Sequence, residues 1–149
     1  MKFFHKSKKD KKNNAQNDPV TENAKQNCNT AISYAKSFEK DFDYSRNSIK
    51  DLEEILDYYS KDISQNRPTE HQIWSMSVIF GSYLGEVMLK NGLSEKGYKW
   101  GQDNTSDIPL LINAAGGYVT PNDKVYKRLV NGTEDNAVVN KYWTRNYFF

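Results

Sequence analysis

The sequence predicts an α+β domain with a helical N-terminal half around one central buried helix, then a small antiparallel sheet and short helices in the C-terminal half. Two observations predict this fold class. Apolar residues recur every three or four positions before Gly92, as on the buried faces of helices, whereas short apolar runs of strand length follow it. At 149 residues, of which 37% are hydrophobic, the chain suits a single domain with one core.

Residues 1–17 differ in composition from the rest of the chain. They hold Lys and Asn with almost nothing to bury, so we expect a disordered basic tail before a single domain at 18–149. We favour a solubilising end; the alternatives are a peripheral anchor on an anionic membrane and a nucleic-acid contact. The residues for either contact are Phe3, Phe4, Lys6, Lys8, Lys9, Lys11 and Lys12. After residue 12 the balance reverses, with 18 acidic and 15 basic residues.

The first helix is predicted over about 19–43. Asp18 followed by Pro19 has the chemistry of a helix start, because aspartate caps a first turn and proline fits it. Apolar residues then recur at helical spacing: Ala24, Cys28, Ala31, Ala35, Phe38 and Phe42.

A second helix is predicted to open at Ser48, where Asp51 completes a capping pattern. One face is apolar, with Ile49, Leu52, Ile55, Leu56, Tyr59 and Ile63. The other face is charged, with Lys50, Asp51, Glu53, Glu54, Asp57 and Lys61. This acidic cluster can be a docking surface for a basic partner, but we favour an ordinary solvated face.

The central helix is predicted over 69–91. Thr69 and Gln72 form a capping box behind Pro68, and Asn91-Gly92 supplies a left-handed stop. Apolar residues leave no wide polar face, so we expect a helix buried on nearly every side. These residues are Trp74, Met76, Val78, Ile79, Phe80, Tyr83, Leu84, Val87, Met88 and Leu89.

Gly81 and Gly85 lie four residues apart on one face of this helix. Glycine weakens a helix interior by about 1 kcal/mol relative to alanine, so we interpret both as structural positions where another backbone comes close. The apolar run from Val78 to Leu89 contains Glu86 and is far shorter than a membrane span, so we reject a transmembrane helix.

The second half of the chain predicts a small antiparallel sheet packed on the glycine face. Strand candidates are 97–101, 108–113 and 118–120, with a turn at 114–117 before the last. Pro121 is a structural position that ends the third strand, because proline cannot continue the ladder.

Two short helices are predicted after the sheet. The first starts near Asp123 and ends at Gly132, which we interpret as a structural residue. The second starts at Thr133. A strand over 137–144 is the competing interpretation. The aromatic end, Tyr147-Phe148-Phe149, must dock on the domain or stay exposed.

No catalytic, metal or cofactor signature is present. A single Cys28 forms no internal disulfide, and His5 and His71 have no ligand spacing. Ser82 is not at the middle of a nucleophile elbow. We therefore expect no metal and no small-molecule cofactor. No apolar stretch follows the N-terminal lysines, so we expect a cytoplasmic protein, with contact at the inner face of the membrane as an option.

Glu86 is the residue that packing alone does not explain. A carboxylate among apolar neighbours needs a cation or hydrogen-bond donors. We favour a structural ion pair with Lys124, Lys127 or Arg128. The alternative is a general acid or base with a raised pKa.

Several segments together resemble an uncharacterised bacterial domain family. The family has a G-x-Y-L-G-E helix, a G-x-W strand and a P-x-x-K-V-x-K-R-L-x-N-G segment; the matching residues are 80–87, Trp100, 108–112, Pro121 to Leu129 and Asn131-Gly132. The resemblance covers about 69–142. Here Trp100 follows Gly97 after two residues, which departs from the strand motif. The resemblance implies a bacterial cytoplasmic protein, and it suggests an immunity or accessory role in a toxin system.

The expected function is a non-catalytic, protein-binding or accessory role, including an immunity-like one, with another protein as partner. The candidate binding residues are Glu86, Tyr83, Trp100, Lys124 and Arg128. The alternatives are an enzyme of unknown reaction that uses Glu86, and a weak membrane or nucleic-acid contact through the basic tail.

Overall fold

The computed structural model of the chain describes residues 18–102 and 107–137, and it has the predicted α+β fold. Its elements in chain order are α2 (Pro19–Ser37), α3 (Ser48–Asn66), α4 (Glu70–Met88), η1 (Leu89–Leu93), η2 (Ser94–Lys96), β1 (Lys99–Gln102), β2 (Pro109–Ile112), β3 (Tyr118–Val119), α5 (Pro121–Asn131) and η3 (Gly132–Asp135).

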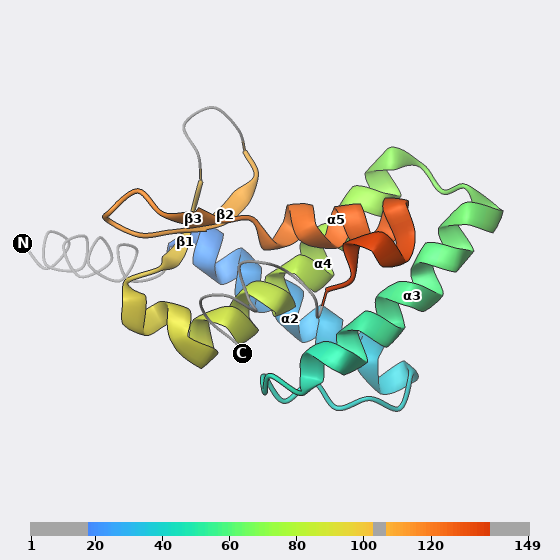
Figure 1. The fold of residues 1–149 in the computed structure, drawn as a ribbon, viewed down its shortest axis with the longest axis horizontal. Helices are drawn as coiled ribbons and strands as arrows, with labels where there is room; N and C mark the ends of the chain where they lie inside the picture. Colours follow the sequence, from blue (N-terminus) through green and yellow to red (C-terminus); the bar gives the residue numbers. More distant parts are fainter. Residues whose placement is uncertain (1–17, 103–106, 138–149) are drawn as a thin grey trace, which may run out of the picture.

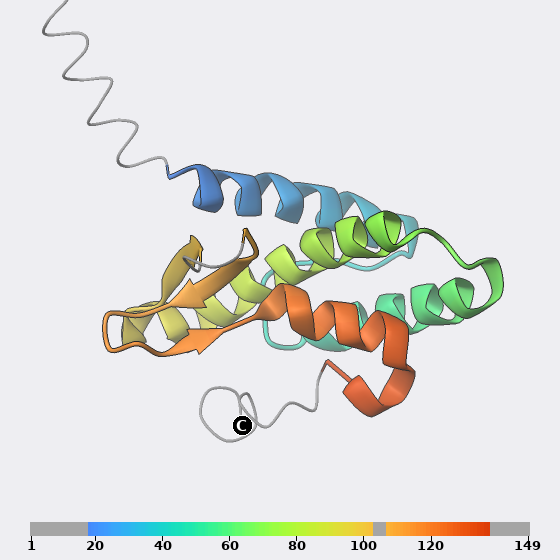
Figure 2. The same ribbon diagram turned by 90° about the horizontal axis from the view of Figure 1, so that it is seen from above.

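Helix α4 is the central element. It packs between α2 and α5, and α5 in turn packs against α3 (Figures 1 and 2). The small sheet lies at the C-terminal end of α4, where β1 also contacts α2. The core therefore surrounds α4, as predicted.

Helix α2 is shorter than the predicted 19–43. The backbone N–H of Phe38 bonds back to the carbonyls of Ala35 and Lys36, and Glu39 is left-handed with a φ of 59°, so the helix stops at Ser37. Phe42 is still buried, because the following loop places its ring in a stack on Tyr83. The predicted stripe of the helix itself is confirmed, with Ala24, Cys28, Ala31 and Ala35 buried.

Helix α3 begins at Ser48 as predicted, and the inner part of its apolar stripe is buried: Ile49, Leu52, Ile55 and Leu56. The predicted capping pattern of Ser48 and Asp51 is wrong, because the N-cap is Asn47 without a side-chain cap and the Ser48 hydroxyl bonds to Ser45 and Tyr83 instead. It ends at Asn66, where Arg67 takes a left-handed conformation with a φ of 44°. The charged face is only partly solvated, because two of its carboxylates hold a buried arginine of α5.

The predicted capping box of α4 is confirmed. Thr69 Oγ1 accepts from the Gln72 N–H at 3.1 Å, and Gln72 Oε1 accepts from the Thr69 N–H at 2.9 Å. Burial on all sides holds only from Phe80 to Met88, with Glu86 half-buried. The first turns keep a solvent-facing side, so four residues predicted as core are half-buried: Trp74, Met76, Val78 and Ile79.

The dihedral angles of the central helix break at Asn91 and Gly92, where the sequence predicted its stop. The regular helix ends at Met88 and widens into the π-helical turn η1, in which Gly92 has a φ of 141°. The Asn91 amide donates to the carbonyls of Val87 at 2.7 Å and Tyr44 at 2.9 Å, which holds this turn in place. The short 3-10 turn η2 follows, and Gly97 ends it with a φ of 82°.

The sheet is antiparallel with strand order β1-β2-β3, and Leu111 of β2 pairs with Trp100 of β1 and with Val119 of β3. Trp100 and Leu111 are buried on the side that faces the helices. Strand β1 begins at Lys99 rather than at the predicted residue 97, because Gly97, with a φ of 82°, still belongs to the turn that ends η2. Strands β2 and β3 lie within their predicted ranges.

The prediction that the glycine face of α4 meets the sheet is right for one glycine and wrong for the other. A Cβ atom at Gly85 would lie 2.5 Å from Cη2 of Trp100 in β1. A Cβ atom at Gly81 would lie 2.6 Å from Cα of Asn122, so Gly81 meets the start of α5 rather than a strand.

Helix α5 begins at Pro121 rather than near Asp123. Pro121 ends β3 and also forms the first turn of the helix, where its missing N–H costs nothing. Gly132 ends α5 with a φ of 81°, as predicted. After η3, the competing helix and strand interpretations of 137–144 fall almost wholly outside the described residues, as do the aromatic end and the tail at 1–17.

Candidate functional site

Glu86 is paired with a neutral donor, not with a lysine or arginine of α5. The indole Nε1 of Trp100 donates to Glu86 Oε2 at 3.0 Å, which joins α4 to β1. The predicted pairing with Arg128 is wrong, because Arg128 points to α3. The half-buried carboxylate also helps to raise the pKa of the buried Cys28 thiol to about 12, after the larger effect of burial, so this cysteine is a poor nucleophile.

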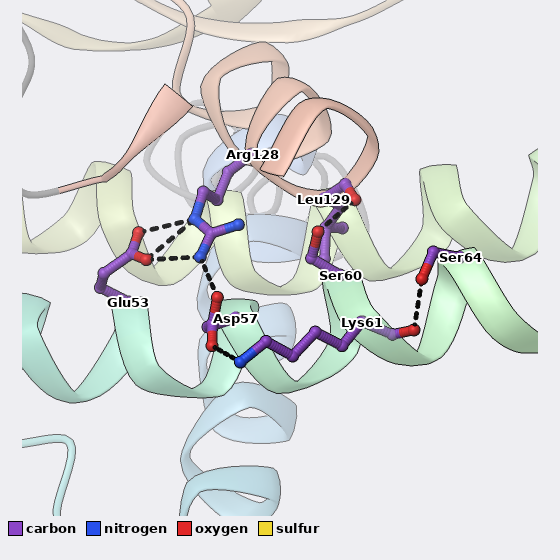
Figure 3. Close-up of polar contacts among 7 residues, drawn as sticks. All are labelled: Glu53, Asp57, Ser60, Lys61, Ser64, Arg128 and Leu129. Atoms are coloured by element: carbon purple, nitrogen blue, oxygen red, sulfur yellow. Dashed lines mark hydrogen bonds and ion pairs between the residues drawn. The ribbon is translucent and has the colours of Figure 1, made fainter. Parts of the chain in front are cut away.

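Arg128 is fully buried and lies between two carboxylates of α3 (Figure 3). Its Nε donates to both oxygens of Glu53, at 2.9 and 2.8 Å, and its Nη2 donates to Glu53 at 2.7 Å and to Asp57 at 2.8 Å. Glu53 also accepts from the Ala137 N–H at 2.8 Å. A buried guanidinium needs such partners, so this cluster fastens α5 and the following chain to α3.

The titration of this cluster follows from its contacts. Burial opposes the charge of Arg128, but hydrogen bonds to Glu53 and Asp57 raise its pKa above the ordinary value. Hydrogen bonds from Lys61 and from Arg128 lower the pKa of Asp57. Within the described part of the chain, Arg128 Nη1 has no hydrogen-bond partner. The cluster is therefore charged at neutral pH and holds α5 against α3.

Lys124 lies nearer to the surface of α5 than Arg128 does. Its Nζ is 3.9 Å from Oδ1 of Asp135 in η3, and its side chain is largely buried. Burial lowers the pKa of the ammonium, although Asp135 and Glu53 act in the opposite direction. Lys124 therefore holds η3 against α5.

Tyr83 and Trp100, two further candidate binding residues, are buried. The Tyr83 hydroxyl accepts from the Tyr44 N–H at 3.0 Å and lies 2.7 Å from Ser48 Oγ. Burial raises the pKa of Tyr83 to about 12. The structure thus places Tyr83 as a support for the loop between α2 and α3, and Trp100 as a core residue of the sheet.

Two exposed aromatic side chains, Tyr34 and Tyr58, lie on a surface formed by α2, α3 and the residue after α2, whereas the exposed Tyr118 lies on the sheet. We call this surface the aromatic face; it consists of Tyr34, Phe38, Tyr58 and Tyr59. Phe38 makes edge-to-face contacts with Tyr58 at 5.2 Å and Tyr59 at 5.6 Å between ring centroids, and the two tyrosines lie 5.4 Å apart. Even so, Tyr58 is 58% exposed and Tyr34 is 43% exposed.

The aromatic face is anchored to the core through Phe80 of α4. The ring of this buried residue lies 6.0 Å from Tyr34 and 5.9 Å from Tyr59. Edge-to-face and tilted pairs at such distances are favourable, so the exposed rings are held in position before any partner arrives.

Sequence reasoning missed both the arginine cluster and the aromatic face. The signal for the cluster was Glu53 and Asp57 at a spacing of four on one helix, together with an arginine beside the apolar Val125 and Leu129. The signal for the aromatic face was that Tyr58 lies outside the apolar stripe of the helix at 48–66. Neither signal shows which other helix packs beside these residues.

No group of His, Cys, Asp and Glu that could hold a metal ion occurs in residues 18–102 and 107–137. Over the same residues, no helix has the length and apolar character needed to cross a membrane. The chain matches no protein-family model, no curated protein and no solved structure. The resemblance to the bacterial domain family therefore stays a prediction.

Proposed function

We propose that this protein is a non-catalytic binding or accessory protein of a bacterial cell, with an immunity-like role, and that it holds another protein on its aromatic face. The observation that carries the proposal is the exposure of Tyr34 and Tyr58 within a set of rings fixed to the core. Burial of these rings against a partner would remove apolar surface from water at little cost in side-chain entropy.

The chemistry of the aromatic face suits a protein partner better than a small substrate. Tyrosine provides a large apolar ring and a polar hydroxyl, and it is enriched among the residues that dominate binding energy at protein interfaces. The rings come from two helices and form a surface rather than an enclosed cavity. A partner would therefore contact α2 and α3 together.

Charged residues on α3 border the aromatic face. Glu54 and Asp62 lie one turn before and one turn after Tyr58, and Lys40 reaches Glu54 at 2.6 Å. The chain beyond residue 12 is acidic overall, which favours the approach of a basic partner. We also propose a cytoplasmic location, with contact of the basic residues 1–17 at the inner face of the membrane as an option.

The test uses the immobilised protein and an extract of the native host. The wild type should capture a specific partner, and Tyr58→Ala should weaken the measured affinity about 30-fold or more if Tyr58 contributes about 2 kcal/mol. Val130→Ala is the matched control, because Val130 is an exposed apolar residue on α5 away from this face. Circular dichroism would establish that each variant is folded.

Two results would count against the proposal. Equal capture of the same partner by the wild type and Tyr58→Ala would place the interface elsewhere on the molecule. Absence of any specific partner, together with turnover in an activity screen, would favour an enzyme.

A further inference from the structure

The outer face of the sheet is apolar along β2 and β3, whereas Lys99 of β1, which pairs with Ile112, places a cation on the same face. Because side chains alternate along a strand, the buried Leu111 leaves Leu110, itself only 8% exposed, and the half-buried Ile112 on the opposite face. Tyr118 of β3 pairs with Ile112 and lies on that face too. Antiparallel sheets with one solvated face usually carry polar residues there, so the composition of this face needs another explanation.

The same face is also hollow. A groove of about 600 Å³ is lined by Ile108, Leu110, Ile112 and Tyr118, with Thr120 and Asp123 among its polar lining residues. Tyr118 is 66% exposed and Ile108 is 37% exposed. An exposed apolar groove of this kind marks a place where another segment or molecule binds. We call it the sheet groove.

The described chain ends at Ala137, whose N–H donates to Glu53 beside Arg128, five residues along α5 from the groove-lining Asp123. The Lys124–Asp135 contact holds η3 against the first turn of α5, and that turn contributes Asp123 to the groove. Residues 138–149 follow directly. Twelve residues can span up to about 40 Å, and the whole of α5 is only about 16 Å long, so the segment can reach the groove.

The composition of this segment matches the groove. It has no acidic side chain, and its two cations are Lys141 and Arg145. Its apolar and aromatic residues are Val138, Val139, Tyr142, Trp143, Tyr147, Phe148 and Phe149. The one charged residue that is known to line the groove is the carboxylate of Asp123. An aromatic, cationic segment therefore complements an apolar groove with an acidic edge.

We propose that residues 138–149 dock in the sheet groove of their own chain. The segment starts near the groove, so the local concentration of its aromatic residues there is high without any partner. Docking covers the apolar sheet face and the aromatic C-terminal residues at once. The proposal is independent of the aromatic face on α2 and α3.

The test is a double-mutant cycle in the full-length chain. Its variants are Tyr118→Ser in the groove, Trp143→Ser with Phe148→Ser in the segment, and their combination. We expect each to lower Tm by about 3 °C or more, and the combination to lower Tm by little more than one of them alone. Val130→Ser, an exposed apolar site outside the groove, should show an additive effect with the segment variant.

Other outcomes overturn the proposal. An unchanged Tm in Tyr118→Ser or in the segment variant would mean that the groove is empty, and additive losses would mean that the two sites do not touch. If the Tm losses of Tyr118→Ser and Phe3→Ser were instead non-additive, the N-terminal segment would be the one that binds in the groove. A dimer in light scattering that Tyr118→Ser abolishes would assign it to a second copy of the chain.

Discussion

Arg128 and Glu53 join two helices that are far apart in the sequence. Two guanidinium nitrogens of Arg128 bind the Glu53 carboxylate, with distances of 2.7 to 2.9 Å, and the arginine is fully buried. This charge-assisted contact fixes the orientation of α5 on α3. Its loss would leave a largely buried carboxylate without its cation, which is more costly than the loss of an exposed pair.

The first prediction concerns this contact. Arg128→Met should lower the free energy of unfolding by about 3–5 kcal/mol, because the largely buried Glu53 carboxylate would lose its guanidinium partner. Urea denaturation measures the change. Lys127→Met is the matched control, since the neighbouring lysine forms an exposed pair with Asp123 and should contribute about 1 kcal/mol or less. Equal, small losses in both variants would contradict the structural role of Arg128.

The second prediction is a loss of stability in acid. The pKa of Asp57 lies below its ordinary value of 3.8, because Lys61 and Arg128 hydrogen-bond to the carboxylate. A lowered pKa in the folded state gives stability that is fully present well above the unfolded pKa and is lost as the pH falls through the folded value. We expect the contribution to be constant near pH 7 and to decline below about pH 5.

Asp57→Asn tests the acid dependence, because asparagine does not titrate. Its free energy of unfolding should fall less steeply between about pH 5 and pH 2 than that of the wild type. Urea denaturation at several pH values gives both curves. Parallel curves would show that other carboxyl groups cause the acid loss.

The third prediction compares the two glycines of α4. Gly81→Ala would place a Cβ atom against the backbone of Asn122, and Gly85→Ala would place one against the ring of Trp100. Both should destabilise the fold by about 1–3 kcal/mol or more through overpacking. Gly81→Ala should cost more, because backbone moves less readily than a side chain.

Ser75→Ala is the matched control for the glycine variants, since Ser75 is exposed on the same helix. Alanine is the better helix former, so this change should be neutral or slightly stabilising. Thermal denaturation ranks the three variants. A Gly81→Ala protein as stable as Ser75→Ala would show that α4 and α5 are not in close contact.

The fourth prediction separates a structural from a catalytic Glu86. Glu86→Gln keeps an oxygen that can accept from Trp100 Nε1, so stability should change by less than about 1 kcal/mol. Glu86→Leu removes the acceptor and leaves a buried N–H unpaired, which should cost about 1–3 kcal/mol. If Glu86→Gln instead abolished a measured turnover without a change in Tm, the enzyme hypothesis would replace the binding proposal.

Local chemistry made much of the fold predictable. The capping box at Thr69, the proline at the start of α2 and the glycine at 132 act within a few residues, so their effects can be inferred from the sequence. The apolar stripes of α2 and α3 are equally local. The early end of α2 escaped prediction, because nothing in the pattern marks Glu39 for a left-handed conformation.

The candidate site was less predictable, because its contacts join distant parts of the chain. The charge of Arg128 was visible, but its choice of Glu53 over Glu86 depends on how α5 packs against α3. Tyr83 and Trp100 were candidate binding residues, yet both are buried here. Tyr58 lies off the predicted apolar stripe and was in no predicted set, and its place on the aromatic face depends on how α2 and α3 pack.

The last prediction concerns the basic tail, residues 1–17, which lie outside the described residues. Six lysines within twelve residues can together give several kcal/mol near an anionic surface, at about 1 kcal/mol each. Phe3 and Phe4 add apolar groups able to insert. Full-length protein should therefore bind anionic liposomes weakly at low salt, and removal of residues 1–17 should abolish binding.

Two controls separate the forces behind this binding and check the domain boundary. Salt should weaken it, because the screening length is only about 10 Å at 0.1 M, whereas Phe3→Ser with Phe4→Ser should reduce it at every salt concentration. The truncated protein should keep the Tm of the full chain, since the domain is predicted to start at Asp18. A Tm lower by several degrees would move that boundary toward the N-terminus. Failure of the full chain to bind at low salt would leave the tail as a solubilising end.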